Sequence, residues 1–428
     1  MLALGLGPWV PFMAACFGRA LGALSLLLLV EGQVLGFAPG FLRNFALYGT
    51  AVYVGISVIR QLIASFFVGP TPDLSIATEV GSFRSETVLW AACSMRGWRD
   101  AMEDEHIAEM LPSSVFPDAA LFAVLDGHGG KEVSSLASRL LIKQVQRCAL
   151  QRLASNSASG DATTGDSGGG NGCAAASSHL LAESLEEALP RLDAQLRVGS
   201  WGLGKLLPGP LHPFAACGST ACVAAVDFRT REVVVANVGD SRTLLIRNGK
   251  ALALSEDHKP ENPKERNRIQ AAGGRVLKMG PCHRVDGTLN LSRALGDFHL
   301  KSNSALPPES QKVVAVPDAT RTKFLGGPQE LLVVACDGLF ERCSNQDVAD
   351  IIWPRLKRGL PLEQIGQELL HACCARSCRG RPIEQGTDNE TVILVQLPPT
   401  EVETSPSEGC PKQRNTVQKN SDSEDTTR

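Results

Sequence analysis

The sequence lacks an excess of charge of either sign. Its 428 residues contain 42 Lys and Arg against 45 Asp and Glu, a formal net charge of −3. A nucleic-acid binder usually carries a basic excess, so we expect no nucleic-acid partner. Hydrophobic residues make up 43% of the chain and charged residues 20%, which excludes a wholly disordered protein. The length allows one large domain or two ordinary ones.

The 13 cysteines lack the paired spacing of a zinc site. Cys373, Cys374 and Cys378 cluster on an expected helix, but no matching pair of ligands faces them. Several other cysteines lie in apolar, strand-like runs, where a buried thiol is the usual finding. We therefore expect reduced thiols and no structural zinc ion.

Charged residues are almost absent from residues 1–70, which contain three Arg, no Lys and a single acid, Glu31. The apolar stretch 45–68 would span about 36 Å as a helix, because each residue adds about 1.5 Å. That length crosses a hydrocarbon core of about 30 Å, and the internal Arg60 can reach the interface. We expect this N-terminal hydrophobic helical segment to anchor the protein in a membrane through one or two helices. A cleaved targeting peptide and a helical extension packed on the domain are the alternatives.

Changes in composition divide the rest of the chain. The sequence Gly69-Pro70-Thr71-Pro72 ends the apolar segment and opens a linker, expected over 71–82. One globular domain is expected over 83–397. Within it, the stretch 155–178 is rich in Gly, Ser and Ala and predicts a surface loop. Residues 398–428 are polar and predict a disordered tail.

The domain alternates between strand-like and helix-like patterns. Stretches rich in Val, Leu and Ala predict strands over 87–91, 121–126, 219–227, 232–238, 243–247, 331–336 and 391–397. Helical periodicity occurs over 131–153, 179–196, 264–272, 345–356 and 362–375. Residues 228–231 and the pair Asn248-Gly249 have the composition of hairpin turns. Sequential hairpins and separate helical blocks favour an α+β fold, with antiparallel sheets covered by helices.

Carboxylates stand beside the hydrophobic runs of this domain. A single Asp-Gly pair after a strand usually marks only a turn. Acids are nevertheless costly at the ends of buried strands, and here five groups occur together: Glu103-Asp104, Asp126, Asp240, Asp337 and Asp388. Carboxylate ligands without an accompanying set of Cys and His suit Mg²⁺ or Mn²⁺. With Arg99 nearby, they suit hydrolysis of a phosphate ester.

Nine motifs, in this order, carry a resemblance to a known family. They are RDAMED at 99–104, VLDGHGG at 124–130, GSTA at 218–221, NVGDSR at 237–242, DHKP at 257–260, AGGRV at 272–276, LSRALGD at 291–297, ACDG at 335–338 and TDN at 387–389. Over 88–397 the chain resembles the metal-dependent serine/threonine protein phosphatases of type 2C. The resemblance implies a four-layer α/β/β/α sandwich of two antiparallel β-sheets flanked by helices, with the metal site at one edge. It also implies hydrolysis of phosphoserine and phosphothreonine in proteins by a hydroxide bridging two metal ions.

The resemblance assigns metal ligands residue by residue. The ligands it implies for Mg²⁺ or Mn²⁺ are Glu103, Asp126, the Gly127 carbonyl, Asp240, Asp337 and Asp388. Asp126 is expected to bridge the two ions. Asp337 and Asp388 are expected to complete the coordination of one ion. Glu103 and the Gly127 carbonyl are expected to complete the coordination of the other. Asp240 matches a position linked to water or a third ion.

The resemblance also implies roles for residues that hold no metal. Asp104 is expected to orient metal-bound water. Arg99 is expected to bind the phosphate, because its planar fork can hold two oxygens. His128 is expected to protonate the leaving seryl or threonyl oxygen, work that suits a side chain with a pKa of about 6.5. Asp297 and Asn389 are expected to be structural supports, Asn389 by fixing the Asp388 turn.

Other functions fit the sequence less well. A kinase is excluded because a Lys-bearing Gly-rich loop and a His-Arg-Asp loop are both missing. The remaining alternative is a catalytically silent pseudophosphatase that acts as a membrane-tethered binding module, although every implied ligand is present. The pair Phe340-Glu341 stands where the family often has Trp-Asp, which predicts a packing change behind the site. Residues 257–290 fall at a variable flap that influences the choice of phosphoprotein substrate.

Two glycosylation sequons bear on localisation. They are Asn290-Leu291-Ser292 and Asn389-Glu390-Thr391, and the second would place a sugar beside the metal ligand Asp388. We therefore expect a membrane protein whose catalytic domain faces the cytosol; targeting to an organelle is the alternative. The catalytic domain itself is expected to be monomeric.

Overall fold

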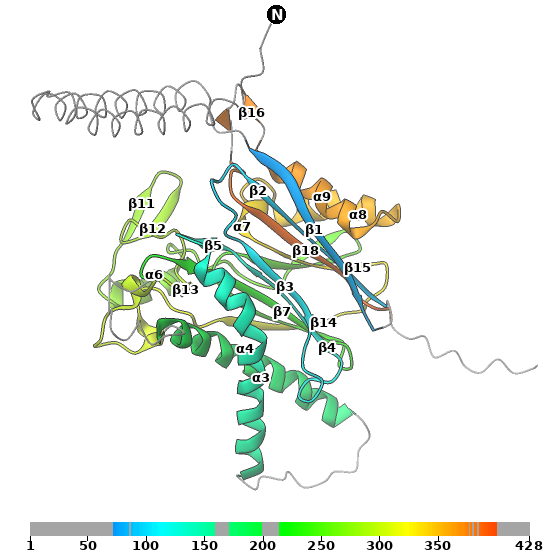
Figure 1. Ribbon diagram of the computed structural model, residues 1–428, viewed down its shortest axis with the longest axis horizontal. Coiled ribbons are helices and arrows are strands. Elements are labelled where there is room, and N and C mark those ends of the chain that lie inside the picture. Colours follow the sequence, from blue (N-terminus) through cyan, green and yellow to red (C-terminus); the bar gives the residue numbers. More distant parts are fainter. Residues whose placement is uncertain are drawn as a thin grey trace, which may run out of the picture.

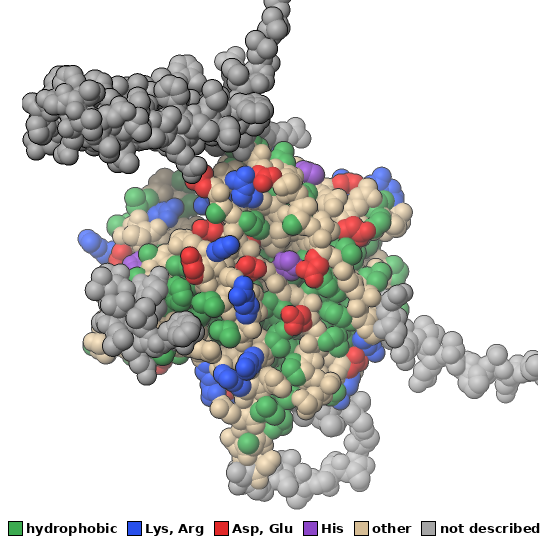
Figure 2. Space-filling view, in the orientation of Figure 1, with side chains coloured by type: hydrophobic (Ala, Val, Ile, Leu, Met, Phe, Trp, Pro, Cys, Tyr) green, Lys and Arg blue, Asp and Glu red, His purple; other side chains and the backbone are tan. Residues whose placement is uncertain are grey.

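The computed structural model describes residues 72–84, 87–158, 171–198, 214–375, 377–378, 381–382 and 385–399. Within them, two large antiparallel sheets pack face to face, and helices cover the outer face of each sheet (Figure 1). This arrangement is the predicted sandwich of antiparallel sheets flanked by helices. Acidic and basic side chains are interspersed over the face seen in Figure 2, in keeping with the near-zero net charge.

The first sheet has six strands in the order β1-β2-β18-β15-β9-β10. They are β1 (Asp73–Phe83), β2 (Val88–Gly97), β9 (Arg242–Arg247), β10 (Lys250–Ala253), β15 (Glu330–Ala335) and β18 (Glu390–Gln396). Although β18 comes last among the strands of this sheet in the sequence, it lies inside the sheet, where it pairs with β2 on one side and β15 on the other. Asn248 and Gly249, which join β9 to β10, have φ angles of 52° and 78°, the left-handed conformation that a type I′ turn requires.

The second sheet has five strands in the order β14-β8-β7-β4-β3. They are β3 (Glu105–Met110), β4 (Ala119–Leu125), β7 (Ala221–Asp227), β8 (Glu232–Val238) and β14 (Asp318–Lys323). Every residue of β4 is buried, because the strand is covered on both faces. Phe122 and Val124 belong to the core shared with the first sheet, whereas Leu121 and Leu125 pack with the helices on the other side.

Four long helices complete the layers. α3 (Glu132–Ala158) and α4 (Asn171–Val198) cover the five-stranded sheet, and α8 (Asn345–Lys357) and α9 (Leu362–Cys373) cover the six-stranded sheet. The short α7 (Asp337–Phe340) follows β15. A capping box begins α8: the Ser344 hydroxyl accepts a hydrogen bond from the Asp347 N–H, and the Asp347 carboxylate accepts one from the Ser344 N–H.

Smaller elements lie along the edges of the sandwich. Two-residue strands β5 (Gly127–His128), β6 (Gly218–Ser219) and β13 (Leu295–Gly296) form a three-stranded sheet in the order β13-β6-β5. The hairpin β11 (Val276–Met279) and β12 (Cys282–Val285) follows α6 (Pro263–Ala271). The remaining elements are η2 (Phe298–Lys301), η3 (Pro308–Ser310), β16 (Ser377–Cys378) and β17 (Arg381–Pro382).

Two predictions about the organisation of the chain are wrong in part. The expected linker 71–82 mostly forms the edge strand β1, which pairs with β2 through eight residues from Ile76 to Phe83 and at Asp73. Most side chains of β1 are exposed, so its sequence carries no hydrophobic alternation. The expected loop 155–178 is helical at both ends, because α3 continues to Ala158 and α4 begins at Asn171.

Other predictions lie outside the described residues. The expected anchor, residues 1–70, and almost all of the expected tail, 398–428, belong to this group. Among the helices of the described ranges, none combines the length and the hydropathy that crossing a membrane requires.

Candidate metal centre

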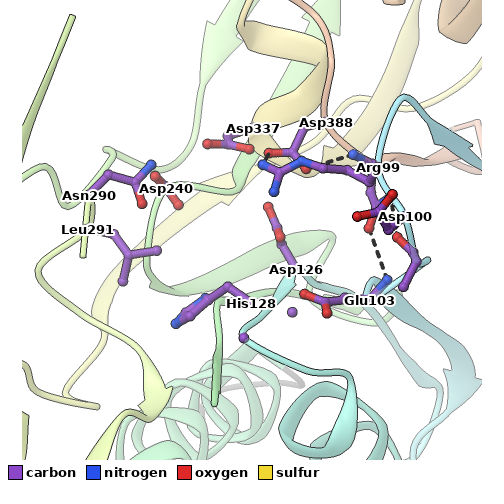
Figure 3. A pocket seen from close by; sticks show the side chains of 14 residues that line it. Arg99, Asp100, Glu103, Asp126, His128, Asp240, Asn290, Leu291, Asp337 and Asp388 are labelled. Atoms are coloured by element: carbon purple, nitrogen blue, oxygen red, sulfur yellow. Dashed lines mark hydrogen bonds and ion pairs between the residues drawn. The ribbon is translucent and has the colours of Figure 1, made fainter. Parts of the chain in front are cut away.

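A cavity of about 360 Å³ opens where strands of both sheets end. Of the site residues predicted from the sequence, it is lined by Arg99, Glu103, Asp126, Gly127, His128, Asp240, Asp337, Asp388 and Asn389. In Figure 3, His128 lies at the side of the space and Arg99 reaches across it to Asp388, while the space is surrounded by the carboxylates of Glu103, Asp126, Asp240, Asp337 and Asp388. Asp104 and Asp297 do not line the cavity.

The ends of the strands bring these carboxylates together. Asp126 follows β4 and Asp240 follows β8, both in the five-stranded sheet. Asp337 follows β15 and Asp388 precedes β18, both in the six-stranded sheet. Because the two sheets pack face to face, the strand ends meet at one edge of the sandwich. The site therefore contains ligand candidates from both sheets.

Polar contacts of Thr220 hold Asp126 in place. The Asp126 N–H donates to the Thr220 hydroxyl over 3.0 Å, and the Thr220 N–H donates to the Asp126 carbonyl over 2.9 Å. The Thr220 hydroxyl also lies 2.7 Å from the hydroxyl of Ser241. Since Ser241 follows Asp240, these contacts join three of the motifs found in the sequence behind the cavity.

Burial and mutual repulsion affect the ionisation of the carboxylates. Loss of solvation raises the pKa of Asp126 and of Asp337 well above the usual range, and the neighbouring carboxylates raise it further. Burial likewise raises the pKa of Asp104. One oxygen of Asp104 accepts a hydrogen bond of 2.7 Å from the Thr391 hydroxyl, whereas its buried Oδ1 has no hydrogen-bond partner among the described residues. An unpartnered buried carboxylate oxygen indicates a place for water or an ion.

Two side-chain cations neutralise part of this charge. Arg99 forms an ion pair with Asp388. Lys259 Nζ lies 2.5 Å from Asp240 Oδ2 and 3.8 Å from Asp337 Oδ2. Within the described residues, no group of three or more His, Cys, Asp and Glu side chains is arranged to hold an ion. Three of the carboxylates lie beside a side-chain cation instead: Asp388 beside Arg99, and Asp240 and Asp337 beside Lys259.

His128 forms a pair with a buried carboxylate. Its Nε2 lies 2.6 Å from Oδ2 of Asp297, a residue that is 1% exposed. Burial lowers the pKa of His128, but the charge and the hydrogen bond of Asp297 outweigh that effect, so the pKa lies above its ordinary value. Asp297, expected to be a structural support, therefore contacts a predicted catalytic residue.

The model of one protein family, described as protein phosphatase 2C, matches residues 89–202 and 208–381, most of the chain. The chain belongs to the protein phosphatase 2C family. It is a metal-dependent serine/threonine protein phosphatase, as the sequence predicts, and the family requires Mg²⁺ or Mn²⁺.

Named relatives of this phosphatase occur in plants and fungi. The chain is 36% identical over 341 residues to "Probable protein phosphatase 2C 58" of Oryza sativa subsp. japonica, covering 76% of this chain and 88% of that protein. It is 34% identical over 327 residues to "Protein phosphatase 2C homolog 2" of Saccharomyces cerevisiae, covering 75% of this chain and 61% of that protein. The serine-threonine phosphatase 2C from Toxoplasma gondii has the same fold, with a TM-score of 0.55 at 21% identity, over 77% of this chain and 98% of that one.

Asn389 connects two loops of the phosphatase site. Its Nδ2 donates to the carbonyls of Arg96 and Ala101 over 2.9 and 3.0 Å, and its Oδ1 accepts a hydrogen bond of 2.9 Å from the Glu103 N–H. We predicted that Asn389 fixes the Asp388 turn. Its side chain binds the loop that carries Glu103, and its backbone N–H donates to Asp388 over 2.7 Å.

Sequence reasoning missed two residues of this phosphatase site. Lys259 lies in the DHKP motif, but nothing in that motif reveals that its side chain reaches the carboxylates. Glu341, part of the departure from the family pattern, accepts hydrogen bonds of 2.7 and 3.1 Å from the N–H groups of Gly386 and Thr387. It therefore orders the loop that leads to Asp388. Beside it, the Phe340 ring packs against the Arg242 guanidinium at 4.2 Å.

Proposed function

We propose that this phosphatase binds two divalent cations, Mg²⁺ or Mn²⁺, in the cavity of Figure 3. The proposed ligands are Glu103, Asp126, the Gly127 carbonyl, Asp337 and Asp388, with Asp240 serving bound water or a third ion. The observation that carries the proposal is the meeting of five carboxylate side chains, from the strand ends of both sheets, in one cavity.

The donor set fits hard divalent cations. The proposed ligands offer oxygen atoms only, and one oxygen of the nearby Asp104 is buried without a partner among the described residues. The repulsion that raises the pKa of Asp126 and Asp337 would be relieved by positive charge between them. When bound, the ions activate water near neutral pH and neutralise the charge of a phosphate ester.

Arg99 and His128 act on the phosphate ester itself. The Arg99 side chain is 56% exposed, so its guanidinium can leave Asp388 and hold two oxygens of an incoming phosphate. His128 lines the same cavity and gives a proton to the leaving seryl or threonyl oxygen. Asp104, behind the cavity, accepts a hydrogen bond from water and so orients it.

Removal of the ligands tests this proposal. Asp126→Asn and Asp337→Asn should each lower kcat/KM for a phosphothreonine peptide on the order of 100-fold or more. Calorimetric titration with Mn²⁺ should show weaker binding by both variants. The matched control is Asp350→Asn, which changes an exposed carboxylate on α8 and should leave both quantities unchanged. Full activity of both ligand variants, or wild-type activity in excess EDTA, would contradict the proposal.

We propose further that residues 1–70 tether a monomeric catalytic domain to a membrane, on its cytosolic side. The long apolar stretches of that segment support the tether, and the sequon beside Asp388 supports the cytosolic side. Fractionation of the tagged full chain, beside a chain lacking residues 1–70, tests the tether. A full chain found in the soluble fraction would contradict the membrane tether. A full chain whose mass falls on endoglycosidase treatment would contradict the cytosolic side.

A further inference from the structure

The three-stranded sheet β13-β6-β5 brings together three motifs that are far apart in sequence. In β5-β6 pairing, His128 lies opposite Gly218, and in β6-β13 pairing, Gly218 lies opposite Gly296. Asp297 follows Gly296 directly. This order places Gly218 between the histidine of the VLDGHGG motif and the aspartate of the LSRALGD motif.

The absence of a side chain at Gly218 makes the contact between His128 and Asp297 possible. A Cβ atom at position 218 would lie 2.2 Å from Asp297 Oδ2 and 2.4 Å from His128 Nε2. Both distances are far below the closest approach of non-bonded atoms. The space that any other residue would fill is therefore occupied by the hydrogen-bonded pair, whose two atoms lie 2.6 Å apart.

The backbone of Asp297 adopts a conformation that few residues accept. Its φ is 49°, in the left-handed region, where Asp and Asn are tolerated better than other residues with a Cβ atom. Its N–H donates to the Cys217 carbonyl over 3.0 Å, which fixes it against β6. A buried charge in such a conformation costs stability, and features of this kind cluster at functional sites.

We propose that Asp297 is a positioning residue for His128. This inference rests on the proposed role of His128 as proton donor. Asp297 accepts the Nε2–H, which fixes the imidazole ring and leaves Nδ1 as the nitrogen that meets the substrate. A water oxygen bonds to phosphorus as the bond between phosphorus and the seryl or threonyl oxygen breaks, and the proton on Nδ1 moves to that departing oxygen. The electron pair of the broken bond stays with the oxygen, and solvent returns a proton to Nδ1 afterwards.

Substrates with different leaving groups distinguish this role from mere structural support. A seryl or threonyl oxygen needs a proton to depart, whereas the nitrophenolate of p-nitrophenyl phosphate does not. Asp297→Asn keeps the volume and accepts the left-handed backbone, but it loses the charge. We expect kcat for a phosphothreonine peptide to fall at least 10-fold and kcat for p-nitrophenyl phosphate less than threefold. His128→Ala should show the same selective loss, and the double variant should lose no more than His128→Ala alone.

Two further measurements keep the test independent of one substitution. Gly218→Ala should separate the pair and reproduce the selective loss. In protein carrying ¹⁵N-labelled histidine, the His128 signals, assigned by their absence in His128→Ala, should show a protonated Nε2 that Asp297→Asn perturbs. The matched control is Asp227→Asn, at a carboxylate that is 1% exposed and accepts hydrogen bonds in the β7–β8 turn; it should leave the ratio of the two kcat values unchanged.

The outcomes separate this inference from the proposed function. Equal losses on both substrates in His128→Ala would remove His128 as the proton donor and this inference with it. A selective loss in His128→Ala, but an equal or absent loss in Asp297→Asn and Gly218→Ala, would overturn only the role of Asp297. Additive losses in the double variant would do the same.

Discussion

Single residues decide how the acidic cavity is neutralised. Lys259 is the least expected of them, because its motif predicts no contact with the carboxylates. Its ammonium group lies 2.5 Å from Asp240 and 3.8 Å from Asp337, and their charges raise its pKa above the ordinary value. Burial alone would have lowered that pKa. Lys259 therefore stays protonated and competes with any cation that Asp240 and Asp337 attract.

Removal of this competitor should strengthen metal binding. We expect Lys259→Met to raise the affinity for Mn²⁺ about fivefold, corresponding to about 1 kcal/mol for one charge at this range. Isothermal titration calorimetry measures it directly. The control is Lys264→Met, which removes an exposed ammonium group that pairs with Asp318 instead. Unchanged or weaker binding by Lys259→Met would show that the lysine does not compete.

At the scale of elements, a buried ionic network joins α6 to the segments around it. Glu265 of α6 lies 2.7 Å from Arg293 and 2.5 Å from Arg268, and it accepts a hydrogen bond of 2.7 Å from the Ser292 hydroxyl. Arg293 in turn lies 2.9 Å from Asp318, which begins β14. The network explains the arginine of the LSRALGD motif as the connection between α6 and the five-stranded sheet.

The network makes the free energy of unfolding depend on pH. Burial alone would raise the pKa of Glu265, but Arg293 and Arg268 outweigh it and lower the pKa from 4.5 to about 2. A lowered pKa stabilises the fold fully above about pH 4.5, and this contribution disappears as the pH falls toward 2. It amounts to about 3 kcal/mol. We expect Glu265→Gln to lose that stability at pH 7. Its free energy of unfolding should also decline less steeply than that of the wild type between pH 4.5 and 2.

Urea unfolding at a series of pH values tests this expectation. Glu309→Gln, at an exposed glutamate in η3, is the control and should keep the wild-type decline. If the free energy of unfolding of Glu265→Gln declines as steeply as that of the wild type, other groups cause the loss of stability in acid.

Element patterns and site contacts differed in how far the sequence could predict them. Apolar runs such as Leu331–Cys336 are buried on both faces, so their composition alone indicates strands. The edge strand β1 was missed because its side chains are mostly exposed. The carboxylates were found because acids at the ends of buried strands are unusual. The hydrogen bonds between Asn389 and Glu103 and between Glu341 and Gly386 could not be predicted from the sequence, because they depend on how separate loops meet in space.

At the scale of the molecule, the proposed ligands connect the two sheets. Asp126 follows a strand of the five-stranded sheet, and Asp337 and Asp388 adjoin strands of the six-stranded sheet. An ion held by both groups would bind the folded protein only, because unfolding separates its ligands. Mass action then links metal concentration to stability.

Metal ions should therefore raise the melting temperature. At a free concentration of 100 times Kd, one ion adds about 2.7 kcal/mol, which corresponds to a rise of roughly 5 °C or more. Differential scanning calorimetry with Mn²⁺ and with EDTA measures the shift. Asp350→Asn should respond as the wild type does, whereas Asp126→Asn should respond weakly. A wild-type melting temperature independent of Mn²⁺ would contradict ligation across the sheets.

The position of β18 also determines when the enzyme can first work. Of the strands that the structure describes, β18 is synthesised last, yet it lies between β2 and β15, and Asp388 and Asn389 immediately precede it. A growing chain on the ribosome therefore lacks both the inside of one sheet and part of the metal centre until this strand has been made. Most of the chain is therefore synthesised before the protein can be active. We therefore expect premature termination before residue 388 to leave an inactive product, because β18 and the proposed ligand Asp388 are then both missing.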